Sequence, residues 1–310
     1  LARKDAAEGQ LRDQRLGDYL DRHRFDATFR SQYLVPMGAA IWSTPEGQME
    51  DYPAESFLRF FDNHRLLHAK RPVWRTVKGG SRTYVARLAA DLGARVRLQT
   101  GATAASPLPD GRVRLRLSDG TTDDFDHVIF ACHGDQARPI LDERYEDQRL
   151  MLGSVRFSKN AVYLHSDPAL MPKRKAAWAA WNLMKTDGQD VCVSYWMNTL
   201  QALDTDQPML VTLNPPRPPD PSLTHGHWSF DHPMFDTVAL AAQRSLKRIQ
   251  GQDGLWFAGA WLGNGFHEDG LKSGLACALA LGGSVPWTAV DVPAYPVPTA
   301  QKAVNANLKV

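Results

Sequence analysis

Cysteine is scarce in this chain. The 310 residues include only 3 cysteines, Cys132, Cys192 and Cys277, and none lies in a C-x-x-C pair or at a spacing typical of a metal site. An odd, sparse set argues against a disulfide framework and is typical of a reducing compartment, so we expect a cytoplasmic protein. The simplest interpretation is three buried thiols that pack as small apolar groups.

Long apolar runs and blocks of like charge are missing as well. No stretch approaches the ~20 apolar residues of a membrane-spanning helix. The formal net charge is only +2, and no Lys/Arg-rich run of the nucleic-acid-binding type occurs. With 43% hydrophobic and 23% charged residues, the composition is that of an ordinary soluble globular protein. We therefore expect a small-molecule or lipid substrate and no nucleic acid, and leave contact with a membrane surface open.

Three familiar catalytic motifs are absent. G-x-S-x-G, the phosphate-binding P-loop and H-E-x-x-H do not occur, so hydrolase and kinase functions have no support. His267, Glu268 and Asp269 form a polar cluster, but adjacent side chains diverge and no second His or Asp follows at ligand spacing such as i+4. We therefore predict no metal.

The most informative stretch is 255–274, LWFAGAWLGNGFHEDGLKSG. Its apolar start, Leu255–Ala258, predicts a short buried parallel strand. Asp269 is a good N-cap, so we expect a helix over Gly270–Leu281. A helix start carries free N–H groups and partial positive charge, which suit a phosphate or the pyrimidine end of a reduced flavin. Between strand and helix, three glycines permit a sharp turn and close approach to something flat or bulky: Gly259, Gly263 and Gly265.

Other elements follow from periodicity and turn signals. Apolar spacing indicates helices within 11–42 and over Ala54–Leu67. A Gly79-Gly80 turn precedes a helix that Ser81 caps and that ends near Asp91. We expect strands at 96–98, 102–104, 112–117, 126–131, 155–164, 178–184, 191–197 and 209–213, Asp-Gly turns at 119–120 and 187–188, and a helix at 235–250.

The run Phe257-Ala258-Gly259, followed by Glu268 and Ser273-Gly274, resembles the C-terminal flavin-binding signature of the flavin-containing amine oxidase and carotenoid desaturase superfamily. The wording GFHEDGLKSG is similar to one branch, the predicted NAD/FAD-binding oxidoreductases found beside or fused to cyclopropane fatty-acid synthases. The resemblance covers nearly the whole chain to about Gly283. Further segments that fit this branch are 33–45, 74–88, 176–182, 194–201 and 211–216.

This resemblance implies an α/β (α+β) fold, with an incomplete two-dinucleotide-type FAD-binding domain and a substrate domain of helices and antiparallel sheet. We expect five segments along the chain. They are a mainly helical substrate-lobe segment over 1–72, a FAD-domain segment over 73–142, an antiparallel-sheet substrate domain over 143–235, a C-terminal FAD-domain segment over 236–284 and an irregular tail over 285–310.

The resemblance also implies which residues contact the flavin. His267 takes the position beside the flavin ring, where it bonds the flavin, accepts a substrate proton as the catalytic residue, or only packs. Phe266 takes the place of an aromatic ring that shapes an apolar slot, and Glu268 that of the superfamily Glu, which bonds nearby backbone amides. Ala260-Trp261 stands where many relatives have an acidic residue. The cofactor-binding residues expected are Gly79, Gly80, Ala102, Ala131, Gly259, Ala260, Gly265, Phe266, His267, Glu268 and Gly270.

One departure from the family pattern concerns the G-x-G-x-x-G unit with which the superfamily begins. No such motif occurs in the sequence, which opens at Leu1 within a charged helical pattern. We interpret the chain as a fragment without an N-terminal FAD-binding segment on the order of a hundred residues. The alternative is a natural variant that lost the cofactor.

The function implied by the resemblance is that of a FAD-dependent oxidoreductase, amine oxidase/desaturase-like, with hydride transfer from substrate to flavin. The branch suggests a fatty-acyl or modified-lipid substrate. Two alternatives stay open: a non-catalytic remnant or interaction module that binds no FAD, and a reductase that uses NAD(P)H. Several of the 9 tryptophans suit either core packing or the lining of a wide apolar pocket, namely Trp42, Trp74, Trp178, Trp181 and Trp196.

Overall fold

The computed structural model describes residues 2–11, 14–42, 45–70, 73–184 and 192–296. The chain divides into two compact units. The first unit combines Leu1–Val96 with Phe157–Met234, and the second combines Arg97–Arg156 with Phe235–Val310. Each unit is therefore built from two separate stretches of chain.

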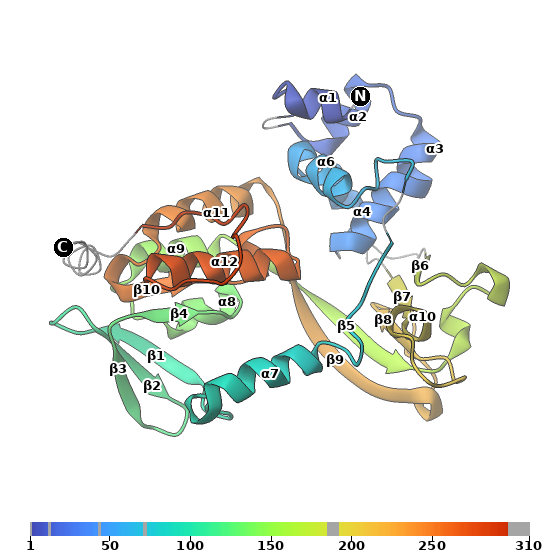
Figure 1. Cartoon of the computed structure of the whole chain (residues 1–310). Coiled ribbons are helices and arrows are strands. Elements are labelled where there is room, and N and C mark those ends of the chain that lie inside the picture. Colours follow the sequence, from blue (N-terminus) through green and yellow to red (C-terminus); the bar gives the residue numbers. More distant parts are fainter. Residues whose placement is uncertain (1, 12–13, 43–44, 71–72, 185–191, 297–310) are drawn as a thin grey trace. The chain divides into compact units, whose positions relative to one another are not determined.

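Helices make up the first part of the first unit (Figure 1). Its core contains Trp42 and Phe57, whose rings lie 5.5 Å apart, and Phe61, which stacks on Phe57. The helix predicted over Ala54–Leu67 ends earlier, at Asn63, because the chain turns at Arg65 with a positive φ of 59°. The helices are α1 (Ala2–Ala7), α2 (Leu16–Arg22), α3 (Ala27–Phe29), the π-helix η1 (Arg30–Leu34), α4 (Val35–Trp42), α5 (Glu46–Met49) and α6 (Ala54–Asn63).

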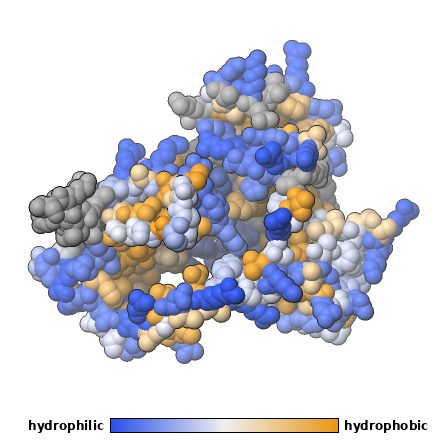
Figure 2. Space-filling model, in the orientation of Figure 1, coloured by the Kyte–Doolittle hydropathy of each residue, from blue (hydrophilic) through white to orange (hydrophobic). Residues whose placement is uncertain are grey.

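Helix α7 (Arg82–Leu92) follows the Gly79-Gly80 turn, and none of its residues is buried. The cap predicted from Ser81 is wrong, since its side chain makes no capping hydrogen bond. Figure 2 shows strongly hydrophilic side chains along α7 with hydrophobic ones beside them. The predicted strand at 96–98 does not form; the short helix η2 (Gly93–Arg95) leads into a turn there. An exposed apolar stripe runs along α7 through Tyr84, Val85, Leu88 and Leu92.

A five-stranded antiparallel sheet completes the first unit, in the order β6-β7-β8-β5-β9. Its longest strand, β9 (Thr224–Pro233), pairs with β5 (Phe157–His165) along its whole length and was not predicted. The other strands lie where they were predicted, within a few residues; the turn at 187–188 lies outside the described residues. They are β6 (Trp181–Met184), β7 (Cys192–Trp196) and β8 (Leu210–Leu213), joined by η4 (Pro168–Leu170), η5 (Lys175–Ala177), α10 (Met197–Gln201) and η6 (Pro221–Leu223).

One face of this sheet carries large apolar side chains that reach solvent. Cross-strand pairing places Leu183 of β6 and Trp228 of β9 in one row, at opposite edges of the sheet. The residues between them in this row are buried, so the face reaches solvent at its edges. Trp228 lies across Gly226, since a β-carbon there would be 2.1 Å from the indole. We call this the apolar sheet face, defined by Trp181 (49% exposed), Leu183 (37%), Trp228 (47%) and Phe230 (50%).

A buried series of hydrogen-bonded polar side chains from β5, β8 and β7 of this sheet fixes the protonation state of His165. The backbone N–H of Asp167 donates to His165 Nδ1 at 3.1 Å, so the ring proton is on Nε2. Nε2 then donates to Thr212 Oγ1 (2.7 Å), which lies 2.7 Å from Ser194 Oγ. Ser194 donates to the carbonyl oxygen of Leu170 at 2.9 Å. The side chains of His165, Thr212 and Ser194 thus all have hydrogen-bond partners.

The second unit contains two small sheets. The meander β1-β2-β3 turns at Asp119-Gly120, as predicted, with Gly120 at a φ of 85°. Strand β4 (Val128–Phe130) pairs in parallel with β10 (Leu255–Phe257), which confirms the predicted parallel strands. Figure 1 shows α9, α11 and α12 gathered beside this pair. The remaining elements are β1 (Ala102–Pro107), β2 (Val113–Leu117), β3 (Thr122–Phe125), α8 (Gly134–Ala137), η3 (Arg138–Ile140), α9 (Glu146–Gly153), α11 (Thr237–Ile249), η7 (Gln252–Gly254), η8 (Ala260–Leu262) and α12 (His267–Ala280).

After α12, residues 285–296 contain no helix or strand, yet they are anchored to the second unit. Tyr295 is only 7% exposed and packs against a cluster that includes Trp256 of β10 and Cys277 of α12. All three cysteines are free, but Cys132 is half-buried rather than buried. No helix in the described ranges is long and apolar enough to cross a bilayer.

Candidate functional site

The carboxyl ends of β4 and β10 meet at one edge of the second unit. Phe257 pairs with Phe130, and the backbone N–H of Ala258 donates to the Phe130 carbonyl at 2.9 Å. Parallel strands end on the same side of a sheet, so Ala131 and Gly259 leave the pair together. Ligands of open α/β sheets bind at such an edge.

The turn after β10 is held from inside the protein. Gly259 has a φ of 155°, and a β-carbon there would lie 2.6 Å from Trp261 Nε1, so only glycine fits. The indole N–H of Trp261 donates to the Cys132 carbonyl at 3.0 Å. Gln243 of α11 donates to two turn carbonyls, those of Trp261 (2.7 Å) and Gly263 (2.8 Å). The shape of the turn is therefore set before any ligand binds.

Helix α12 begins at His267, three residues earlier than predicted, with Phe266 as the N-cap residue. Asp269 is therefore not the N-cap. Its carboxylate lies one turn inside the helix and accepts from the Phe266 backbone N–H at 3.1 Å, which caps the helix from within. Burial raises the pKa of this carboxyl group. The sequence thus identified Asp269 as a capping residue, but the predicted helix start was three residues too late.

Ser273 and Gly270 bring the helix against the turn. Ser273 Oγ accepts from the Gly259 backbone N–H at 2.9 Å and lies 2.9 Å from the Gly270 carbonyl oxygen, to which it donates. A β-carbon on Gly270 would lie 3.6 Å from the backbone nitrogen of Ala260. The bare α-carbon of Gly270 therefore faces the backbone of the turn.

The side chains of His267 and Glu268, the first two residues of α12, are exposed to solvent. The role of His267 stays a prediction. The Glu268 side chain is 68% exposed and pairs with Lys272 at 3.7 Å. Its expected bond to a nearby backbone amide is made by Asp269 instead. Within the described residues, no group of three His, Cys, Asp or Glu lies close enough to hold a metal ion.

Most of the predicted cofactor residues lie in the second unit, but not all do. Gly79 and Gly80 belong to the first unit, in the turn before α7. Ala102 opens β1 in the separate meander. The predicted residues that the structure brings together at the β4–β10–α12 edge are Ala131, Gly259, Ala260, Gly265, Phe266, His267, Glu268 and Gly270. Their contact with a flavin stays a prediction.

Two residues that organise this edge were missed from the sequence. Trp261 was read only as a departure from the family pattern. Gln243 had an available signal, because it lies among the buried positions Ala239, Ala242 and Leu246 of α11. A polar residue within an apolar helical stripe needs buried partners, which here are the turn carbonyls.

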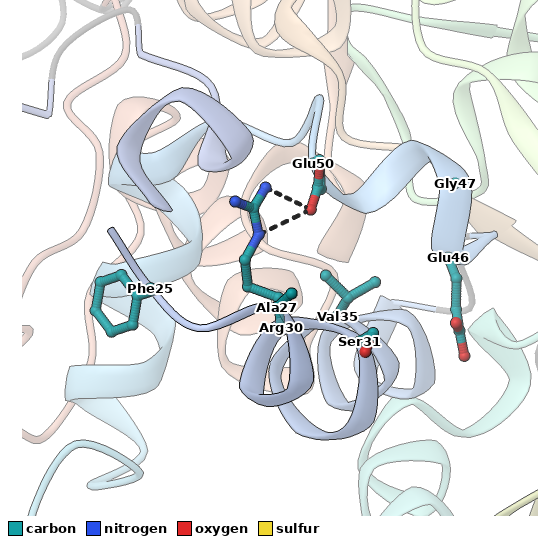
Figure 3. Close-up of a pocket in the computed structure, with 8 residues that line it drawn as sticks. All are labelled: Phe25, Ala27, Arg30, Ser31, Val35, Glu46, Gly47 and Glu50. Atoms are coloured by element: carbon teal, nitrogen blue, oxygen red, sulfur yellow. Dashed lines mark hydrogen bonds and ion pairs between the residues drawn. The ribbon is translucent and has the colours of Figure 1, made fainter. Parts of the chain in front are cut away.

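A cavity of about 450 Å³ lies in the first unit, between the start of η1 and α5 (Figure 3). Its one basic group, Arg30, donates to Glu50 Oε1 at 2.8 Å and is also bonded to Asp21. The guanidinium charge is therefore already neutralised. The cavity offers no unpaired cation that would hold the diphosphate of a dinucleotide.

Comparison with known families decides the affiliation. The model for flavin containing amine oxidoreductases matches residues 3–281. The chain belongs to this family. This confirms the superfamily resemblance and makes FAD the cofactor expected of the family. The predicted link to cyclopropane fatty-acid synthases stays a prediction. Comparison with curated proteins gave no match.

Solved structures agree on the fold. The chain is similar to a fatty acid isomerase from P. acnes that produces CLA, with a TM-score of 0.57 and 13% identity over 83% of this chain and 64% of that one. A double mutant of putrescine oxidase gives a TM-score of 0.60 at 12% identity, over 86% and 67%. Reduced UDP-galactopyranose mutase gives 0.57 at 11%, over 85% and 66%. The chain thus spans about two thirds of the length of these proteins.

The residues at the edge fit the ring end of a flavin. The α-carbon of Gly270 leaves room beside Ala260 that a larger side chain would fill. The first N–H groups of α12, on His267 and Glu268, have no acceptor within the helix, as at any helix start. The diphosphate end of FAD is normally held by the G-x-G-x-x-G fingerprint, and the sequence lacks this motif.

Proposed function

We propose that this chain forms part of a FAD-dependent oxidoreductase that removes a hydride from an apolar substrate. The single observation that carries the proposal is the β4–β10–α12 edge, where a glycine turn and the start of α12 meet. FAD, when bound, supplies the hydride acceptor, a chemistry that protein side chains do not provide. Gly259, Ala260, Gly265 and Gly270 would hold its ring end.

The start of α12 gives this edge its electrostatic role. The helix is 14 residues long and is capped by Asp269 from inside, so its first N–H groups remain oriented outward. Partial positive charge at a helix start stabilises negative charge that develops nearby. Gln243 and Ser273 fix the turn, so the backbone need not rearrange when the helix start stabilises negative charge on a ligand.

His267 is the proposed catalytic residue. It is the first residue of α12 and its side chain is exposed, so it is free to bond a ligand at the edge. Imidazole exchanges protons near neutral pH, which suits a group that accepts a proton from a substrate as the hydride leaves. His267→Gln keeps a polar side chain but removes the base, and should slow turnover without loss of bound flavin.

The apolar sheet face supports an apolar substrate, such as a fatty-acyl chain or a modified lipid. Trp181 at one edge of the sheet and Trp228 and Phe230 at the other are each about half exposed, which leaves large aromatic side chains open to a ligand. Aromatic rings bind aliphatic chains through large, rigid contact areas. Trp181 thus belongs to the tryptophans proposed as lining, whereas Trp42 belongs to the core.

The test of this function uses the full-length protein. Purified wild type should absorb at flavin wavelengths, and Gly270→Val should lose the flavin, because the isopropyl group fills the space beside Ala260. Ala278→Val, at an exposed position of the same helix, is the matched control and should retain flavin. Colourless wild-type protein would favour the non-catalytic alternative, and normal flavin content in Gly270→Val would refute the assignment of the edge.

A further inference from the structure

Trp261 is a large buried side chain in the short helix η8, within the turn that follows β10. It is 2% exposed, although its neighbours Ala260 and Gly263 are half-buried. Two glycines make room for it. A β-carbon on Gly259 would lie 2.6 Å from its Nε1, and one on Gly134, at the start of α8, would lie 3.4 Å from its Cη2.

The indole continues the pairing of β4 with β10 past the end of the sheet. The last backbone bond of the pair joins Ala258 to the Phe130 carbonyl. The next inward carbonyl on the β4 side, that of Cys132, receives the Trp261 Nε1 proton at 3.0 Å. The backbone of Trp261 is held from the other side, because Gln243 donates to its carbonyl. One residue therefore ties both strand ends and α11 together.

We propose that Trp261 is a positioning residue that sets the spacing between the ends of β4 and β10, and hence the seat of the flavin ring. The proposal rests on the proposed function, because the two segments that it joins contain Ala131, Gly259 and Ala260. Trp261 itself points inward and does not contact the flavin. Its effect on the cofactor passes through the backbone that it fixes.

The test compares two buried tryptophans in the full-length protein. Trp261→Phe keeps a buried ring but removes the donor to Cys132. Trp256→Phe on β10 is the matched control, since Trp256 is also fully buried and its indole N–H faces His127 at 3.4 Å, away from the turn. Both variants should unfold at lower temperature than wild type.

Only Trp261→Phe should change the flavin site. FAD must then order strand ends that the wild type holds in place, so its dissociation constant should rise by up to about tenfold, the equivalent of one buried hydrogen bond, and the visible spectrum of bound flavin should shift. Hydrogen exchange should accelerate at 131–134 and 259–263 in this variant and stay unchanged there in Trp256→Phe. Equal FAD affinity and equal spectra in the two variants would overturn the proposal.

A second arm separates this inference from the proposed function. If wild-type protein binds no FAD, the proposed function fails, but exchange at 131–134 and 259–263 still decides whether Trp261 fixes the strand ends. Unchanged hydrogen exchange at these positions in Trp261→Phe would refute the positioning role.

Discussion

Gly270 links the stability of α12 to its proposed task. A methyl group at this position would make only ordinary contact, 3.6 Å from the Ala260 nitrogen, and the backbone of Gly270 is helical. Glycine within a helix costs roughly 0.5–1 kcal/mol relative to alanine. The stability of the fold therefore gains nothing from glycine at this position. A flat ligand does gain from it, because it can approach the bare backbone closely.

We expect Gly270→Ala to raise the thermal stability of the flavin-free protein and to lower its affinity for FAD. Calorimetry and flavin titration measure the two effects separately. Because alanine improves the helix, lost affinity in this variant is not explained by misfolding. A variant that is less stable than wild type, or that binds FAD equally well, would contradict the role given to this glycine.

His165 makes the first unit sensitive to acid. Burial lowers the pKa of His165 below the ordinary value of a histidine, and its Nδ1 already accepts the Asp167 N–H, so a second proton has no place. The unfolded chain takes up that proton below about pH 6.5 and the folded chain does so only at lower pH. This contribution to stability is present above pH 6.5 and is lost as the pH falls below it.

The free energy of unfolding should therefore fall between pH 7 and 5, with a slope from this group of at most about 1.4 kcal/mol per pH unit. In His165→Gln the protein is less stable overall but this slope is absent. His267→Gln, at an exposed histidine, is the control and should keep it. Denaturant titrations across this range measure the slopes, and equal slopes in wild type and His165→Gln would refute the assignment.

At the scale of elements, sequence patterns predicted the helices, strands and turns that interactions between neighbouring residues determine. Short apolar strands, Asp119-Gly120 and the amphipathic α11 were recognised because neighbouring residues decide them. Strand β9 was missed although Trp228 and Phe230 alternate with polar residues, because they are its only strongly apolar residues and its partner β5 lies far away in the sequence. Trp261 was missed for the same reason, since its acceptor on Cys132 is 129 positions away.

The irregular segment after α12 is a structural part of the second unit. Tyr295 buries its ring against Ala258 of the strand end and Ala276 of α12. Replacement of a buried aromatic ring by alanine costs about 3 kcal/mol or more. We expect Tyr295→Ala to lower the melting temperature clearly, whereas Trp287→Ala, at a side chain that is 57% exposed, should change it little. Equal, small effects of both would show that the segment is not anchored.

At the scale of the whole molecule, we find no feature among the described residues that matches the diphosphate of FAD. The sequence contains no G-x-G-x-x-G, and the described part of the parallel sheet consists of β4 and β10, with Ile129 of β4 43% exposed. Parallel sheets are normally covered on both faces. We therefore keep the hypothesis that a further polypeptide segment holds the diphosphate and covers these surfaces.

The 310-residue chain alone should accordingly bind FAD weakly and tend to aggregate. Joined to a segment that carries a glycine fingerprint, it should become soluble and retain flavin. Gel filtration and flavin fluorescence measure both properties. Tight, stoichiometric binding of FAD by the 310 residues alone would show that the site does not depend on such a fingerprint.

The interleaving of the two units also has a consequence in time. During synthesis the chain emerges at about 5–20 residues per second, so Trp261 appears on the order of ten seconds after Cys132, 129 positions earlier. Throughout that interval β4 exists without β10, and its hydrogen-bonding edges are open to any other strand. The β4–β10–α12 edge can therefore close only after α12 has emerged from the ribosome, and a nascent chain that stalls before residue 255 cannot begin to assemble it.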